Sequence, residues 1–415
     1  MQTMLFLSQR LPYPPTKGEK IRSWHLFQHF AQRYRMLLGC LVDDADDLQY
    51  LDVLRPLCAE MVTFLIDKRR QKLKALARFR PGRPLMLDYN HHPGLVAWAQ
   101  TKLTRDGVDV AFMFSTPMAQ YVLPVVQAPN WQRPRPALVL DMVDVDSEKW
   151  REYGQGARQP MKAVWQREAR TLLAYERRST LACDLSLLVS EPECARFRSL
   201  EPAIGARLQP VENGVDLTLF SPEQRFDRPY AAPGPHLVLV GHMDYWPNAD
   251  AAIWFARDIL PLIRARHPDA VFAVVGANPG PNVQALAKLP GVLVTGKVAD
   301  VRPYVAHAAA AVVPLRIARG IQNKVLEAMA MGRPVVATPQ AHEGVRAAPG
   351  RDLLVADTPA SLATAVIAVL DGQHPTLGAA GRHAVETGYT WPASLAKLDR
   401  LLAALPPHPM QRGAA

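Results

Sequence analysis

The fold of this chain is decided by the segment Arg319–Pro339, which reads RGIQNKVLEAMAMGRPVVATP. Its centre is a run of good helix formers, and Gly332 and Pro334 end that run before a short apolar strand. Another strand-like run, AAVVP, comes shortly before it at residues 310–314. A strand, a helix and a second strand in this order predict a βαβ unit with two parallel strands.

Short apolar runs of this kind alternate with helical segments along the whole chain. The strand-like runs lie at residues 3–8, 35–42, 61–66, 108–115, 136–143 and 183–190 in the first half, and at 236–240, 270–275, 291–295, 310–314, 334–338 and 352–356 in the second. Helical periodicity is clearest at Pro247–Arg264, Asp300–Ala308 and Ile321–Met331. Because these strands are apolar throughout rather than alternating, we expect helices on both faces of each sheet.

The predicted architecture is therefore α/β, with two Rossmann-like, doubly wound domains that face a cleft. The loop-like stretch between Gly205 and Phe226 is the natural hinge. We expect an N-terminal domain at residues 1–215 and a C-terminal domain at residues 216–390. Residues 391–415 should form a helix that crosses back towards the N-terminal domain, followed by a tail. Open parallel sheets bind ligands at the carboxyl ends of their strands, so a site shared between the domains is expected.

Composition and charge limit the class of protein. Hydrophobic residues make up 49% of the 415 and charged residues 21%, which fits a globular protein and excludes a disordered chain. The four cysteines lack the close spacing of a zinc site or a disulfide framework, and no stretch approaches the roughly 18 apolar residues of a transmembrane helix. The formal charge of +10 indicates an anionic partner.

The start of the helix within Arg319–Pro339 has the features of a phosphate site. Free backbone amides and the positive end of the helix dipole lie there, and Gly320 permits close approach of the backbone. Lys324 adds a cation, and Glu327 can accept hydrogen bonds from the hydroxyl groups of a ribose. The alternative is a surface helix with a Lys–Glu pair at i,i+3, which stabilises a helix by only a few tenths of a kcal/mol.

Two motifs resemble a known family. LEAMAMGRPVVAT (Leu326–Thr338) is similar to the donor-binding signature of retaining GT-B glycosyltransferases of family 4, and ENGVDLTLF (Glu212–Phe220) resembles their interdomain signature. More narrowly, four stretches resemble the sugar transferases of PEP-CTERM exopolysaccharide systems: PYPPTKGEKIRSWHL, DVDSEKWREY, GHMDYWPNADA and PLRIARGIQNKVLEAMAMG. The resemblance implies a GT-B fold and transfer of a sugar from a nucleotide diphosphate sugar, with residues 1–215 on the acceptor side and residues 216–390 as the donor domain.

The resemblance also implies roles for single residues. Glu327 matches the glutamate that binds the donor ribose, but Arg319 stands where a second glutamate usually holds the transferred sugar. His242 and Asn248 stand roughly where the family has an arginine and a lysine that bind the diphosphate. Arg316, Arg319 and Lys324 could supply the missing cations. The expected donor-binding residues are Gly18, Asn248, Gly276, Asn278, Lys297, Val298, Arg316, Gly320, Ile321, Gln322, Lys324 and Glu327.

The catalytic residues that we expect are Arg319, Lys324, Glu327 and Asp141. Asp141 follows the strand PALVL at the place where the family often has a histidine that faces the reaction centre, and Asp144 and Ser147 are nearby. One of these carboxylates could orient the acceptor hydroxyl, although Asp141 could equally cap a turn. Gly18 matches the glycine loop after the first strand, for which a plain turn is the alternative.

No cofactor and no metal ion are expected beyond the nucleotide diphosphate sugar as co-substrate. Cations and helix amides can stabilise the leaving diphosphate without a metal. The run DVD at Asp144–Asp146 is the one place that suggests an ion site, and we consider it the weaker alternative.

The segment Asp67–Pro84 is strongly basic. Its cations are Lys68, Arg69, Arg70, Lys72, Lys74, Arg78, Arg80 and Arg83. An apolar stripe of Leu73, Leu76 and Ala77, with Phe79 beside it, would let such a helix lie on an anionic membrane surface. The alternative is a solvated charged face. Nucleic acid is not expected as a partner, because no nucleic-acid motif accompanies the charge.

Together with these residues, the resemblance implies a metal-independent, retaining glycosyltransferase of exopolysaccharide or cell-surface glycan synthesis. Its partners would be a nucleotide sugar donor and a saccharide acceptor that is expected to be lipid-linked. We expect it in the cytoplasm, peripheral on the inner face of the membrane. Two rivals share the architecture: a nucleotide-sugar 2-epimerase, and a catalytically degenerate scaffold that binds a partner.

Overall fold

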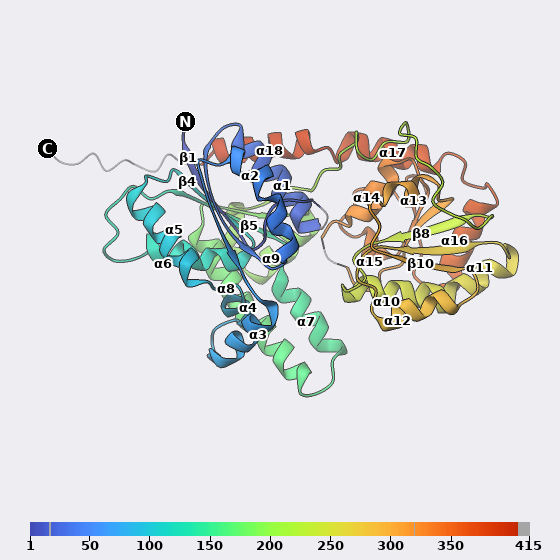
Figure 1. Cartoon of the computed structure of the whole chain (residues 1–415), viewed down its shortest axis with the longest axis horizontal. Coiled ribbons are helices and arrows are strands. Elements are labelled where there is room, and N and C mark those ends of the chain that lie inside the picture. Colours follow the sequence, from blue (N-terminus) through green and yellow to red (C-terminus); the bar gives the residue numbers. More distant parts are fainter. Residues whose placement is uncertain (16–17, 319, 406–415) are drawn as a thin grey trace. The chain divides into compact units, whose positions relative to one another are not determined.

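The computed structural model describes residues 1–15, 18–318 and 320–405, and it divides into two compact units (Figure 1). Of the described residues, the first unit contains Met1–Val211 and Leu395–Leu405, and the second contains Glu212–Ser394. The change of unit at Val211 lies inside the stretch that the sequence marks as a hinge. No helix among the described residues is long and apolar enough to cross a membrane.

The first unit is built on a parallel sheet in the order β3-β2-β1-β4-β5-β6-β7. The strands are β1 (Thr3–Ser8), β2 (Arg35–Val42), β3 (Glu60–Leu65), β4 (Val110–Phe114), β5 (Ala137–Val143), β6 (Leu185–Leu188) and β7 (Leu208–Pro210). The first six confirm the predicted apolar runs. Only β7 was missed, because it is a three-residue edge strand that ends in Pro210, and proline cannot donate to a ladder.

Helices cover both faces of this sheet. Successive residues of β1 point to opposite faces: Met4 and Phe6 join a core with Phe27 of α1, whereas Leu5 and Leu7 join a second core. The helices are α1 (Gly18–Ala31), α2 (Leu51–Leu54), α3 (Lys68–Ala77), α4 (Leu85–Tyr89), α5 (Pro93–Arg105), α6 (Leu123–Val126), α7 (Asp146–Gly156), α8 (Met161–Ala182), α9 (Glu191–Leu200) and the larger part of α18 (Trp391–Ala403), which begins in the second unit. This arrangement confirms the doubly wound fold.

The second unit has a parallel sheet in the order β10-β9-β8-β11-β12-β13. Its strands are β8 (His236–Val240), β9 (Val271–Val275), β10 (Val292–Gly296), β11 (Ala310–Val313), β12 (Val335–Ala337) and β13 (Leu354–Val355), all at predicted apolar runs. Its helices are α10 (Trp246–Trp254), α11 (Leu260–Arg266), α12 (Pro281–Gln284), α13 (Arg302–Ala306), α14 (Asn323–Ala330), α15 (Pro339–His342), α16 (Pro359–Leu370) and α17 (Leu377–Gly388). The predicted helix at Pro247–Arg264 is interrupted by a π-helical turn, Phe255–Ile259, shortly before Pro261, which lacks an N–H donor.

Both sheets have a point at which the strand order reverses. In the first unit the chain leaves β1 for β2 and β3 on one side and returns to β4 on the other. In the second unit the same reversal separates β8 from β11. Crevices outside the carboxyl ends of two such strands are the usual ligand sites of open parallel sheets. The loops after β1 and β4, and after β8 and β11, are therefore the places to look for function.

Candidate active site

In the second unit, the loops after β8 and β11 meet in a direct side-chain contact. Asn248 lies in the first turn of α10, which follows β8, and Lys324 is the second residue of α14, which follows β11. The Lys324 ammonium donates a hydrogen bond of 2.6 Å to Oδ1 of Asn248. Two side chains 76 residues apart in sequence are thus joined at the switch point.

The approach to α14 explains the glycine in the motif. Gly320 has a φ of +60°, a conformation that residues with a Cβ rarely adopt. Its carbonyl is also approached closely, because a Cβ at Gly344 would lie 2.3 Å from the Gly320 oxygen. Ile321 is buried, Gln322 is the extended N-cap, and the helix starts at Asn323 rather than at the predicted Ile321. The first amides of α14 point out of the helix beside Lys324.

Lys324 and Glu327 lie one turn apart on α14, and burial perturbs both. Burial lowers the pKa of Lys324 to about 8, and the nearby Glu327 carboxylate opposes that shift. Burial raises the pKa of Glu327 to about 7, and Lys324 opposes that shift in turn. A poorly hydrated ammonium beside free helix amides is well suited to bind an anionic group such as a phosphate. Perturbed groups at a switch point are candidates for a functional site.

Of the two arginines predicted to support Lys324, the structure describes Arg316 but not Arg319. Arg316 is half-exposed and is engaged by α10: its Nε donates to Asp250 Oδ2 at 2.9 Å, and its guanidinium lies over the Trp254 ring at 5.3 Å from the centroid. The Asp250 carboxylate therefore partly neutralises the positive charge of Arg316. Arg319 lies outside the described residues, so its proposed role stays a prediction.

The remaining predicted donor residues lie on the loops after β9 and β10. Gly276 is required by packing, because a Cβ there would lie 1.8 Å from the Gly241 carbonyl oxygen. Asn278 has a φ of +57° and donates through Nδ2 to Asp244 at 3.2 Å. Lys297 and Val298 follow β10, where Lys297 is exposed and Val298 half-buried. Since β10, β9, β8 and β11 are adjacent, these predicted residues gather at one sheet edge.

In the first unit, Asp141 has a different environment from the one that the sequence suggested. It is fully buried in β5, and Oδ2 accepts a 2.8 Å hydrogen bond from the buried Arg22, which also donates to the Val211 carbonyl at 2.7 Å. Its Oδ1 accepts from the Val143 amide at 3.1 Å. Burial raises the pKa of Asp141, and Arg22 opposes that shift. These contacts favour the alternative role, that of a buried turn cap, over a contact with the acceptor.

The switch point of the first unit carries residues that the sequence did not single out. Ser115 directly follows β4 and donates from Oγ to Oε1 of Gln9, which directly follows β1, at 3.0 Å. Ser115 has a φ of +80°, and Val143, the last residue of β5, has a φ of +68°. Positive φ is strained for both residues, and such strain is common at functional sites. Nothing in the sequence signals these angles.

Two further predicted positions complete the first unit. Asp144 follows the strained Val143, its Oδ1 is buried without a hydrogen-bond partner, and burial raises its pKa to about 7. Asp144 lies directly after the end of β5, whereas Asp141 lies within the strand. Gly18 is the exposed first residue of α1, directly after two residues that are outside the described ranges. In the described ranges, no cluster of three His, Cys, Asp or Glu residues could hold a metal ion.

Comparison with known proteins finds a family model that matches the region of this site. Residues 234–372 match the family model described as Glycosyl transferases group 1. This region is a glycosyl transferases group 1 domain. It contains Asn248, Lys324 and Glu327, so the switch-point contact belongs to the matched domain. A search of the curated proteins finds no match by sequence.

Solved structures resemble the whole chain. Sucrose-phosphate synthase from Thermosynechococcus elongatus has a TM-score of 0.71 at 18% identity, over 98% of this chain and 99% of that one. HepE of Anabaena, solved with UDP and glucose, has a TM-score of 0.67 at 15% identity, over 98% and 100%. WaaG, a glycosyltransferase involved in lipopolysaccharide biosynthesis, has a TM-score of 0.64 at 16% identity, over 96% and 99%. At these identities the likeness establishes the fold, which is GT-B. Together with the matched domain it makes the chain a glycosyltransferase.

Proposed function

We propose that the chain is a retaining glycosyltransferase of family 4 that moves a sugar from a nucleotide diphosphate sugar to a saccharide acceptor. The observation that carries this proposal is the placement of Lys324 and Asn248 at the switch point of the glycosyl transferases group 1 domain, beside the amino end of α14. HepE of Anabaena, which has the same fold, has been solved with UDP-glucose. We extend that kind of donor to this chain.

The proposed chemistry follows from the charges at α14. The diphosphate lies against the first amides of α14 and the Lys324 ammonium, and Glu327 accepts hydrogen bonds from the ribose. As the bond between the anomeric carbon and the diphosphate oxygen breaks, negative charge grows on that oxygen, and preorganised donors stabilise it. The acceptor hydroxyl attacks from the same face, and its proton passes to the departing diphosphate. The reaction needs no side-chain nucleophile and no metal ion.

The proposed acceptor is a lipid-linked saccharide of exopolysaccharide or cell-surface glycan synthesis. The structural support for a membrane location comes from α3. The buried Gln71 fixes the orientation of this helix, since its Nε2 donates to the carbonyls of Tyr89 and His91 at 3.0 and 3.1 Å. The opposite side of the helix exposes Leu73 and Leu76, which are 66% and 61% exposed. The exposed Lys72, Lys74 and Arg78 neighbour these leucines in the sequence, which is the pattern of a helix at an anionic surface.

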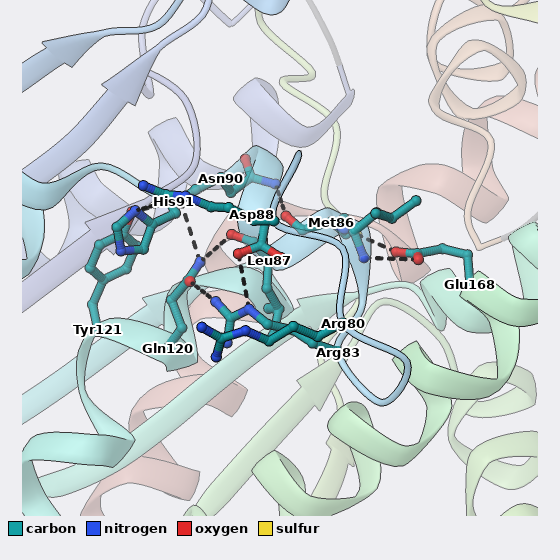
Figure 2. A network of polar contacts seen from close by, with 12 residues as sticks. Arg80, Arg83, Met86, Leu87, Asp88, Asn90, His91, Gln120, Tyr121 and Glu168 are labelled. Atoms are coloured by element: carbon teal, nitrogen blue, oxygen red, sulfur yellow. Dashed lines mark hydrogen bonds and ion pairs between the residues drawn. The ribbon is translucent and has the colours of Figure 1, made fainter. Parts of the chain in front are cut away.

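The chain that follows α3 is held in place by a polar network (Figure 2). Glu168 of α8 accepts hydrogen bonds of 2.9 Å from the amides of Leu85 and Met86 at the start of α4. Arg83 donates to Asp88 at 3.0 Å and to Gln120 at 3.2 Å. The exposed leucines are therefore presented on a fixed support. We propose that this face rests on anionic lipid with the enzyme on the cytoplasmic side.

A vesicle assay tests the membrane part of the proposal. The wild type should sediment with vesicles that contain phosphatidylglycerol and not with phosphatidylcholine alone. Replacing Leu73 and Leu76 by serine should weaken this binding, whereas Leu262→Ser, which changes an exposed leucine of α11, should leave it intact. Equal binding to both kinds of vesicle would refute an anionic lipid partner, and binding to neither would refute the membrane location.

Nucleotide binding and product analysis test the enzymatic part. One of UDP, GDP, ADP and TDP should raise the melting temperature, and the matching sugar donor should give a product with the donor's anomeric configuration, also in the presence of EDTA. Loss of activity in EDTA and its return with a divalent ion would refute metal independence. Conversion of the donor to its epimer without acceptor would support the 2-epimerase instead. A folded wild type that binds none of the nucleotides would support the scaffold.

A further inference from the structure

We propose that Asn248 is a positioning residue: it holds the Lys324 ammonium towards the donor diphosphate and does not itself bind the donor. This inference rests on the proposed function and differs from the sequence-based expectation, in which Asn248 replaces a donor-binding cation. It follows from the contacts on both ends of the Asn248 side chain.

Asn248 is itself held rigidly. It is buried, its backbone N–H donates to the Tyr245 carbonyl at 3.0 Å, and its side-chain Nδ2 donates to the His242 carbonyl at 2.9 Å. Gly241 makes room for the amide, because a Cβ at Gly241 would lie 2.6 Å from Nδ2 of Asn248. The loop between β8 and α10 is thus folded around this one side chain.

These contacts also fix which way the amide points. Nδ2 faces a carbonyl, which can only accept, and Oδ1 faces an ammonium, which can only donate. A flipped amide would place like groups against each other on both sides. The carbonyl end of Asn248 is therefore directed at Lys324 by the surrounding loop.

A neutral acceptor is what Lys324 needs at this position. An ammonium has three donors, so one hydrogen bond to Asn248 leaves two for phosphate oxygens. Without Asn248 the lysine could turn to Glu327, its i+3 neighbour on α14, and the resulting ion pair would reduce the positive charge offered to the diphosphate. Asn248 keeps the ammonium in place without cancelling its charge.

Among the described residues, the charged groups on the elements next to Lys324 include the ion pair between Arg316, in the loop after β11, and Asp250 of α10. Glu327 is the charged group that perturbs it within α14. From α10 it meets the neutral Asn248, with His242 next to that contact. Arg382 of α17 reaches the far end of the helix, where it donates to the Ala330 carbonyl. A carboxylate introduced at position 248 would therefore be the nearest new influence on Lys324.

The test compares Asn248→Asp and Asn248→Ala with the wild type and Lys324→Ala. Affinity for UDP, GDP, ADP and TDP is measured by calorimetry from pH 6 to pH 10, and the tightest ligand is followed. Gln373→Glu, at an exposed position beyond α16, adds the same charge away from the site. Melting temperatures confirm that each variant is folded. Asn248→Ala keeps the test valid if the aspartate variant is unstable.

The inference predicts a weakening of roughly tenfold or more at pH 7 in both Asn248 variants, with Gln373→Glu like the wild type. In Asn248→Asp, the pH at which affinity declines should also move upward, because a carboxylate raises the pKa of the lysine. Wild-type affinity and pH profile in the Asn248 variants, with weak binding in Lys324→Ala, would overturn the inference alone. If the wild type binds no nucleotide, or Lys324→Ala binds like the wild type, the proposed donor site itself fails.

Discussion

The strongest prediction concerns the pH dependence of donor binding and its loss in Lys324→Met. Lys324 is expected to bind the diphosphate only when protonated, and burial has lowered its pKa to about 8. At pH 7 about nine-tenths of the free enzyme then carries the ammonium. At pH 9 only about a tenth does, so the dissociation constant should rise by about tenfold between these values.

The same lysine should contribute to affinity at neutral pH. A hydrogen bond to a charged group is worth about 1.5–3 kcal/mol, so Lys324→Met should weaken nucleotide diphosphate binding by roughly 10- to 150-fold at pH 7. Its affinity should also no longer decline between pH 7 and pH 9. Isothermal titration with the nucleotide that binds best measures both effects. A variant that retains the decline would show that another group titrates, and a variant with wild-type affinity would refute the role of Lys324.

Three further predictions concern stability and the acceptor. Gly344→Ala should lower the melting temperature and weaken donor binding, because its Cβ would lie 2.3 Å from the Gly320 oxygen. Gly156→Ala, whose Cβ would meet nothing within 4 Å, should do neither. Equal effects of the two substitutions would refute the packing argument. Arg22→Met should reduce the free energy of unfolding in urea by about 3–5 kcal/mol, since it strands the Asp141 carboxylate, and Arg22→Met with Asp141→Leu should recover part of that loss. Ser115→Ala should raise the KM for the acceptor and leave donor affinity unchanged, and the opposite pattern in steady-state kinetics would contradict an acceptor role for the first switch point.

The strands could be predicted from the sequence because each is a continuous apolar run. Strand β7 could not, since three residues that end in Pro210 carry little pattern. Gly320 and Lys324 could also be singled out from the sequence, because both belong to one local motif at a helix start. Local patterns thus predicted the elements and one half of the candidate site.

The contacts between distant segments could not be predicted from the sequence. Whether Asn248 faces the donor or Lys324 depends on β8 and β11 being neighbours, which the order of the sheet decides and no local pattern records. Asp141 looked available because it follows an apolar strand, but Arg22, 119 residues away, reaches it in the interior. The strain at Ser115 lies in its backbone φ angle, which cannot be predicted from the presence of a serine.

The central claim is that a donor diphosphate binds at the amino end of α14, next to Lys324. The most direct measurement is a crystal structure with the nucleotide diphosphate that stabilises the protein most. We predict that its phosphates lie against the first amides of α14, within hydrogen-bond distance of Lys324 Nζ, with the ribose hydroxyls on Glu327. A nucleotide bound anywhere else on the chain would contradict the account.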